Sequence, residues 1–187
     1  MKSEDEIRQA TVGAVQPLTG PIEIRDYDPE WPRMFAREAE RIRAALGGRV
    51  SALEHAGSTA VPGLPAKPRI DMVLVVADSA DEPAYVPDLV AAGYHLQIRE
   101  PDWYEHRMLK GPDIDVNLHV FSDGCPEVAR MLLFRDWLRT CAEDRELYAS
   151  TKRRLAERNW TYVQQYADAK TEVVEEILAR AQAGTRS

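Results

Sequence analysis

The stretch that decides the fold runs from His55 to Val76 and reads HAGSTAVPGLPAKPRIDMVLVV. It predicts the end of a strand, a turn of small residues, a rigid connector that carries Lys67, and a buried strand that begins with Asp71. Gly57 allows the backbone to approach a ligand closely, and the free amides of such a turn favour an anion. The stretch therefore indicates a phosphate-binding turn facing a candidate metal ligand. An ordinary loop rich in glycine, serine and proline fits the same letters.

Composition and charge narrow the class of protein. The chain of 187 residues is long enough to form one domain with its own core. Its net charge of −7 argues against a binder of duplex nucleic acid, but leaves room for a small phosphorylated ligand held by a local basic cluster. The first ten residues do not resemble a signal peptide, and no apolar run approaches the roughly twenty residues of a membrane span. We expect a cytoplasmic protein in which Cys125 and Cys141 are reduced thiols without a metal.

Hydrophobic periodicity predicts both strands and helices in the first part of the chain, and helices alone from about residue 126. We expect residues 1–20 to form a flexible arm and residues 21–183 to form one domain. The predicted helices cover 29–46, with Asp28 as N-cap, and 84–92, 127–140, 144–158 and 162–182. The predicted strands cover 22–24, 50–55, 70–76, 94–99, 105–110 and 115–121, and the last three form an antiparallel meander.

The last predicted strand carries a second group of polar residues. Asp113, Asp115, Asn117 and His119 alternate with apolar residues, so an extended chain places all four side chains on one face. These residue types are poor strand formers but good ligands for a metal or a sugar phosphate. The alternative is the solvated outer face of an edge strand.

Asp71 is a lone carboxylate at the start of a buried strand, where an unpaired charge is costly. An ion pair with Arg69 or Lys67 would satisfy it. If the glycine turn lies over the start of this strand, Asp71 and Asp115 together could instead bind Mg²⁺ while Ser58 and the turn amides hold a phosphate.

The remaining candidates each have an ordinary alternative. A lysine between two prolines suits contact with phosphate, or it is a solvated loop residue. A histidine at a strand end is a ligand or base, or a packed side chain. Basic residues on the later helices contact an anionic ligand, or they form salt bridges along the helix. His95 and His106 have no supporting neighbours in the sequence and are assigned as surface or strand residues. The candidates in this group are Lys67, His55, Thr59, Arg135 and Lys152.

These stretches together resemble the GrpB family over about residues 22–180. The matching residues are 22–24, 26–32, 55–64, 66–68, 70–71, 117–121 and 134–139, with Tyr148, Lys152, Tyr166 and Lys170. The run GSTAVPGL from Gly57 to Leu64 is specific for the family. What the resemblance implies is an α/β (α+β) fold, a nucleotidyltransferase-like mixed sheet flanked by helices, with a helical C-terminal part.

In that superfamily a Gly-Ser turn grips the nucleotide phosphates, an acid pair on the next strand binds metal, and a later strand supplies a third acid. Gly57 and Ser58 match the turn, and Asp71 matches half of the acid pair. Asp115 can supply the third acid, with His119 beside it. Val73 stands where a second acid is usual. A two-metal mechanism, in which metal ions bind both the attacking and the leaving oxygen, would therefore lack one of its carboxylate ligands.

The resemblance and the residues give two main hypotheses. The first is an enzyme that transfers a nucleotidyl or phosphoryl group from a nucleotide to a small acceptor with one Mg²⁺. The second is a non-catalytic module that binds a nucleotide or a CoA precursor, since relatives occur fused behind dephospho-CoA kinase, where the domain is thought to assist folding or regulation. A purely structural domain is a third and weaker idea. No motif in the sequence identifies the acceptor, the base preference or the oligomeric state. The residues assigned to chemistry are Asp71, Asp115 and His119, and those assigned to phosphate are His55, Gly57, Ser58, Thr59, Lys67, Arg135 and Lys152.

Overall fold

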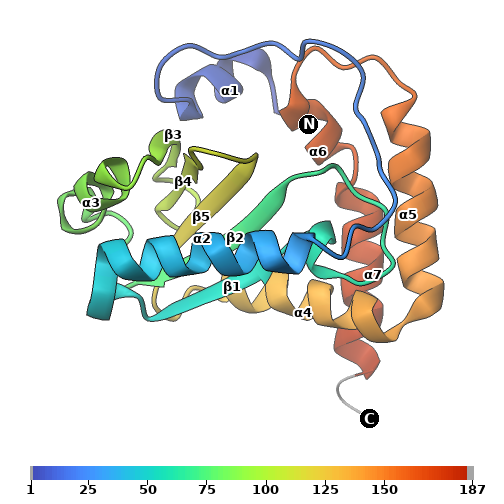
Figure 1. Cartoon of the computed structure of the whole chain (residues 1–187). Coiled ribbons are helices and arrows are strands. Elements are labelled where there is room, and N and C mark those ends of the chain that lie inside the picture. The colour runs from blue at the N-terminus through green and yellow to red at the C-terminus, as the bar shows by residue number, and fades with distance from the viewer. Residues whose placement is uncertain (1, 185–187) are drawn as a thin grey trace.

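A five-stranded mixed sheet lies at the centre of the structure, a computed structural model that describes residues 2–184 (Figure 1). The strand order is β1-β2-β5-β4-β3. The strands are β1 (Ala52–Ala56), β2 (Ile70–Val76), β3 (His95–Glu100), β4 (His106–Lys110) and β5 (Val116–Ser122). Strands β2 and β5 are parallel, and the other neighbouring pairs are antiparallel. The predicted mixed sheet and the predicted meander of the last three strands are confirmed.

Helices cover both faces of this sheet. The alternation of β2 sends Met72 and Leu74 into a core with α2 (Trp31–Leu46) and α3 (Val86–Ala91). It sends Val73 and Val75 into a second core with α4 (Pro126–Thr140). Because both faces of β2 are covered, its sequence is a continuous apolar run apart from one carboxylate. That carboxylate belongs to Asp71, the second residue of the strand, whose side chain is 29% exposed.

The last part of the chain forms three helices, α5 (Ala142–Ala156), α6 (Val163–Asp168) and α7 (Thr171–Gly184). The prediction of a single helix over 162–182 is wrong. The two pieces serve different cores, since Tyr166 packs with Ile22 and Leu155, whereas Ile177 packs in the cluster around Leu138. The change of direction falls at residues 169–170, where no glycine or proline marks it.

The predicted flexible arm instead contains a helix, α1 (Glu4–Ala10), beside β3 (Figure 1). Ser3 and Glu6 form a capping box at its start, which fixes the first turn. Ile7 is buried, and the amide of Val12 donates to the carbonyl of Gln97 on β3 at 2.8 Å. The physical reason for the difference is that a seven-residue helix is too short to show a sustained hydrophobic period.

Two further details differ from the sequence prediction. Residues 22–24 form no strand, and the adjoining segment makes only an isolated bridge between Arg25 and Ala66. Asp28 is not the N-cap of α2, because the helix begins two residues later and Glu30 occupies that position. The Asp28 carboxylate instead accepts a hydrogen bond from the amide of Glu30 at 2.8 Å.

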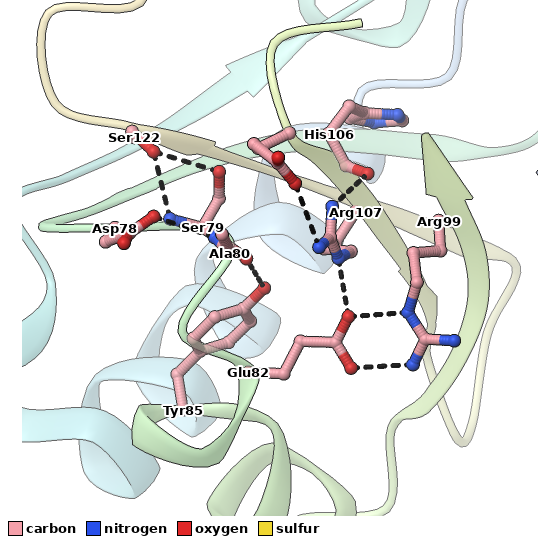
Figure 2. Close-up of polar contacts among 10 residues, drawn as sticks. Asp78, Ser79, Ala80, Glu82, Tyr85, Arg99, His106, Arg107 and Ser122 are labelled. Carbon is pink, nitrogen blue, oxygen red and sulfur yellow. Dashed lines mark hydrogen bonds and ion pairs between the residues drawn. The ribbon is translucent and has the colours of Figure 1, made fainter. Parts of the chain in front are cut away.

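An ion-pair cluster fixes the β3–β4 hairpin to the segment before α3 (Figure 2). Glu82 accepts hydrogen bonds from Arg99 on β3 at 2.6 and 2.7 Å and from the buried Arg107 on β4 at 2.6 Å. These contacts lower the pKa of Glu82 to about 2, with the Arg99 hydrogen bonds as the main cause. These contacts therefore hold in place the hairpin that carries His106.

Candidate functional site

The glycine turn lies directly against the Asp71 carboxylate. Gly57 has φ 67° and ψ −170°, a conformation that residues with a side chain rarely adopt. A Cβ atom at this position would lie 2.6 Å from Oδ2 of Asp71. A 3₁₀ turn over Ser58–Ala60 follows, and its leading amides have no carbonyl within the turn to bind. The expected position of the turn over the start of β2 is confirmed.

Two buried side chains hold this turn to β2. The Thr59 hydroxyl donates to the carbonyl of Arg69 at 3.1 Å, so it accepts from Nε2 of His55 at 3.0 Å. The His55 ring stacks on Phe35 with centroids 4.8 Å apart, and burial lowers the pKa of His55 to about 4. Of the two interpretations of His55, the packed and hydrogen-bonded side chain agrees with these contacts. Thr59 is only 1% exposed, and its hydroxyl is used within the fold.

A strip of polar side chains continues from Asp71 along the same face of the sheet. Asn117, its partner in the parallel register, donates from Nδ2 to Oδ1 of Asp71 at 3.0 Å. Nε2 of His119 lies 3.8 Å from the same oxygen. Burial would raise the pKa of Asp71, but the neighbouring His119 ring and the charges of Arg69 and Lys170 outweigh it and lower the pKa.

Asp115 is part of a different arrangement from the one predicted. Its Oδ2 accepts from Nε of Arg69 at 2.7 Å, and its Oδ1 pairs with the Lys110 ammonium. Lys110 also donates to Oδ1 of Asn117 at 2.9 Å, which connects Asp115 to the strip. Asp113 does not share this face, contrary to the alternation argument. It precedes the start of β5 and pairs with Arg41 of α2, because the chain is not yet extended there.

Basic side chains crowd around the turn. Lys152 of α5, 2% exposed, donates to the Ser58 hydroxyl at 2.9 Å and to the carbonyl of Pro65. Burial, with repulsion from Lys170 and Arg153, lowers the pKa of Lys152 to about 6. Burial, with repulsion from neighbouring cations, also lowers the pKa of Lys67 and of Lys170 to about 8. The basic side chains of this cluster are Lys67, Arg69, Lys110, Lys152 and Lys170, and its carboxylates are Asp71 and Asp115. With a pKa of about 6, Lys152 is mostly neutral at pH 7.

Arg135 is engaged by the fold beside the turn. Its guanidinium donates at 2.9 Å to both the Glu54 carboxylate and the carbonyl of His55, and it also pairs with Asp136. Arg139, one turn further along α4, donates to the carbonyl of Ala60 at 3.0 Å. The two arginines therefore tie α4 to both ends of the glycine turn.

The residues present do not fit the expected magnesium site. Both oxygens of Asp115 are paired with cations, and one oxygen of Asp71 accepts the Asn117 amide. Val73, at the position of the missing acid, is completely buried on the α4 side. Within residues 2–184, no group of three or more histidine, cysteine, aspartate or glutamate side chains is arranged to hold a metal ion. The basic side chains that surround these carboxylates are better suited to an anion than to a divalent cation.

Several residues of this site lie outside the set assigned to chemistry or phosphate from the sequence, among them Lys110, His106 and Lys170. Lys110 and His106 occupy the same face of β4 as His119 on β5, since Met108 is the partner of His119 in the register. His106 is on a strand, as predicted, but it is buried and bonded to His119. Lys170 belongs to the residues that carry the family resemblance, and the charge of Asp71 acts on it. The signal that could have identified them is that His106 and Lys110 are polar residues on the same face of a predicted strand.

The fold belongs to a known structural class. Over 73% of this chain and 43% of the other, it resembles Cid1 in complex with its short product ApU, with a TM-score of 0.51 and 16% identity. Another structure with the same TM-score is of the Cid1 poly(U) polymerase with Mg and 3'-dATP bound, at 14% identity. At such identities the likeness concerns the fold alone. The architecture is nucleotidyltransferase-like.

Closer relatives identify the family. The GrpB protein family model matches residues 21–180. The chain is 57% identical to UPF0157 protein BH1888 of Halalkalibacterium halodurans, over 97% of this chain and 93% of that protein. It also matches the crystal structure of conserved protein GrpB from Enterococcus faecalis, with a TM-score of 0.77, 26% identity, and coverage of 88% of this chain and 100% of that one. The chain belongs to the GrpB family.

A more distant match covers part of a longer enzyme. The dephospho-CoA kinase of Mycolicibacterium paratuberculosis is 32% identical over 74% of this chain, but the match spans only 40% of that kinase.

Among the described residues, no helix is both long and apolar enough to cross a membrane.

Proposed function

We propose that this protein binds a small phosphorylated molecule, of the nucleotide or CoA-precursor class, at the turn formed by Gly57 and Ser58. The observation that carries the proposal is the crowding of basic side chains at this turn in a chain whose net charge is −7. Burial and mutual repulsion lower the pKa of three lysines there, so a bound anion would relieve an unfavourable arrangement. The leading amides of the 3₁₀ turn supply donors without a cost in side-chain order.

Each of the lysines has a distinct part in this proposal. Lys152 already donates to the Ser58 hydroxyl and can turn from the Pro65 carbonyl to a phosphate oxygen. Lys67 is carried on the connector between two prolines, which limits the entropy lost on binding. Lys170 lies over the Tyr166 ring, with Nζ 4.6 Å from the centroid. An anion would bind between these groups and the turn.

The test is a thermal-shift panel on the full chain with nucleoside triphosphates, dephospho-CoA, phosphopantetheine and pyrophosphate, each with and without Mg²⁺. A ligand at 100 times its Kd stabilises the folded state by about 2.7 kcal/mol, and each kcal/mol raises the Tm by about 2–4 °C for a chain of this size. Lys67→Met and Lys170→Met should lose the shift. Arg37→Gln is the matched control, since Arg37 is an exposed cation on α2. A panel without any shift would refute the proposal.

A second candidate is the transfer of a nucleotidyl or phosphoryl group from a bound nucleotide to a small acceptor. What favours it is the position of the Asp71 carboxylate and Nε2 of His119 next to the turn. It predicts a new product from labelled nucleotide and a mixture of small acceptors, and loss of that product in Asp71→Asn with ligand binding retained. Binding without product in every mixture, with or without Mg²⁺, would leave the binding module as the function.

A further inference from the structure

A chain of hydrogen-bonding side chains crosses the sheet from β3 to β2. Oε2 of Glu100 lies 2.8 Å from Nδ1 of His106, and Nε2 of His106 lies 3.0 Å from Nδ1 of His119. The remaining ring nitrogen, Nε2 of His119, faces Oδ1 of Asp71 at 3.8 Å. The side chain of His106 is only 5% exposed, so water cannot easily replace either of its partners. Each link uses a different ring nitrogen, so the position of the proton on one ring constrains its position on the next.

The position of the protons is set at the Glu100 end. Burial would raise the pKa of Glu100, but His106 and the Lys2 ammonium outweigh it and lower the pKa to about 2. An ionised carboxylate only accepts hydrogen bonds, so Nδ1 of His106 must carry a proton. Burial lowers the pKa of His106 to about 4 in spite of Glu100, so the ring is neutral near pH 7. A neutral imidazole has one proton, and Nε2 of His106 is therefore an acceptor.

The same reasoning fixes the tautomer of the next ring. Since Nε2 of His106 accepts, Nδ1 of His119 must donate to it, whether His119 is neutral or protonated. His119 can then gain or lose a proton only at Nε2, the atom that faces Asp71. When His119 is protonated, its Nε2 proton points toward Asp71, and this is the state in which the ring lowers the pKa of Asp71. When His119 is neutral, two acceptor atoms face each other, and a donor placed between them would satisfy both.

We propose that Glu100 and His106 are positioning residues that hold His119 in its Nδ1–H tautomer, so that Nε2 accepts a hydrogen bond from a hydroxyl of the bound ligand beside Asp71. The part concerning the ligand hydroxyl rests on the proposed function. The part concerning the tautomer depends only on the contacts of these rings.

Packing keeps the His106 ring from turning over. It stacks on the Phe121 ring with centroids 4.9 Å apart, and the Trp103 ring meets it edge-on at 5.0 Å. Its main chain is anchored as well, because Nη1 of Arg107 donates to the carbonyl of His106 at 3.2 Å while the same guanidinium holds Glu82 (Figure 2). A flip of the ring would exchange the two nitrogens and break the links at both ends.

The experiment is a long-range ¹H–¹⁵N NMR spectrum of the histidine rings in the full chain without ligand, at about pH 8, where free imidazole is neutral. In the wild type, Nε2 of His119 should be the unprotonated nitrogen. In His106→Leu, His119 should revert to the Nε2–H form that free imidazole favours in water. His106→Gln should retain the wild-type tautomer, because a glutamine can donate to Glu100 and accept from His119. His95→Gln is the control, since His95 is an exposed histidine on β3.

A wild-type His119 that carries its proton on Nε2 would overturn the inference, even if His106→Leu failed to fold. So would an unchanged His119 tautomer in a folded His106→Leu.

The hydroxyl is tested with a nucleotide and its dideoxy form, or another ligand of the panel and its deoxy analogue. Loss of the hydroxyl should weaken binding to the wild type and leave binding to His106→Leu unchanged. Equal weakening in both proteins would refute the role of the tautomer. A panel without any binder would refute the proposed function and the hydroxyl role together, whereas the tautomer result stands apart from both.

Discussion

Substitution of Gly57 by alanine tests whether the turn is built around the Asp71 carboxylate. The new Cβ would lie 2.6 Å from Oδ2 of Asp71, closer than such contacts occur, and 3.0 Å from its Cβ, which is tighter than most contacts of this kind. The backbone conformation adds a cost of about 1–3 kcal/mol, since it is essentially limited to glycine. Overpacking adds about 1–3 kcal/mol more. We therefore expect Gly57→Ala to destabilise the fold by about 2–6 kcal/mol.

A double-mutant cycle isolates the contact with the carboxylate group. In an Asp71→Ala background the 2.6 Å contact with Oδ2 disappears, whereas the backbone cost and the 3.0 Å contact with the Cβ at position 71 remain. The coupling free energy between the two substitutions should therefore be about 1–3 kcal/mol. Gly63→Ala is a matched control, because Gly63 also has a positive φ, of 76°, and no atom within 4 Å of the position of its Cβ. The assay is chemical denaturation of the four proteins of the cycle and of the control.

The reasoning fails if the two substitutions are additive within about 0.5 kcal/mol. Additivity would mean that the turn moves away from Asp71 at little cost. The carboxylate and the phosphate-binding amides would then not be held in a fixed relation.

Three further predictions follow from other parts of the structure. Binding of pyrophosphate should weaken as pH rises through about 8, because Lys67 and Lys170 lose their protons there, and calorimetric titrations at pH 7 and pH 9 would measure it. The pKa of Glu82 is depressed to about 2, so its ion pairs stabilise the fold above pH 4.5 and are lost as pH falls from 4.5 toward 2; Glu82→Gln should flatten this part of the Tm–pH curve. Ser3→Ala should cost α1 about 1 kcal/mol and speed hydrogen exchange in residues 4–10, whereas Ser150→Ala, in the middle of α5, should leave that exchange unchanged.

Long periodic elements could be predicted from the sequence because their burial is regular. The helix ending at Leu46, the apolar strand β2 and the meander all have a repeating pattern that one covered face imposes. The break between α6 and α7 had no such mark, since both halves keep an apolar face and only their partners differ. Helix α1 was not predicted because it is too short to show a hydrophobic period, although Ser3 and Glu6 carry the capping pattern.

In the candidate site, contacts close in sequence were easier to predict than contacts across strands. The turn at Gly57 and its approach to Asp71 followed from a glycine and a short rigid connector. The link from His106 to His119 depends on the register of β4 and β5, which a single sequence does not fix. The pairing of Asp115 with Arg69 and Lys110 likewise required the order of the strands. The sequence predicted magnesium from the carboxylates alone, because it did not show that these cations lie beside them and occupy their oxygens.

The parallel pairing of β2 with β5 has a consequence for the time course of folding. The hydrogen bond from Asn117 to Asp71 joins residues 46 positions apart, whereas the β4–β5 meander closes over a short loop. Distant contacts close slowly, so we expect the meander to form early and β2 to join it late. The carboxylate then meets its amide partner only in the last stage of assembly. A newly made chain would acquire its capacity to recognise a ligand at the end of folding, and the rate at which that capacity appears would report completion of the sheet.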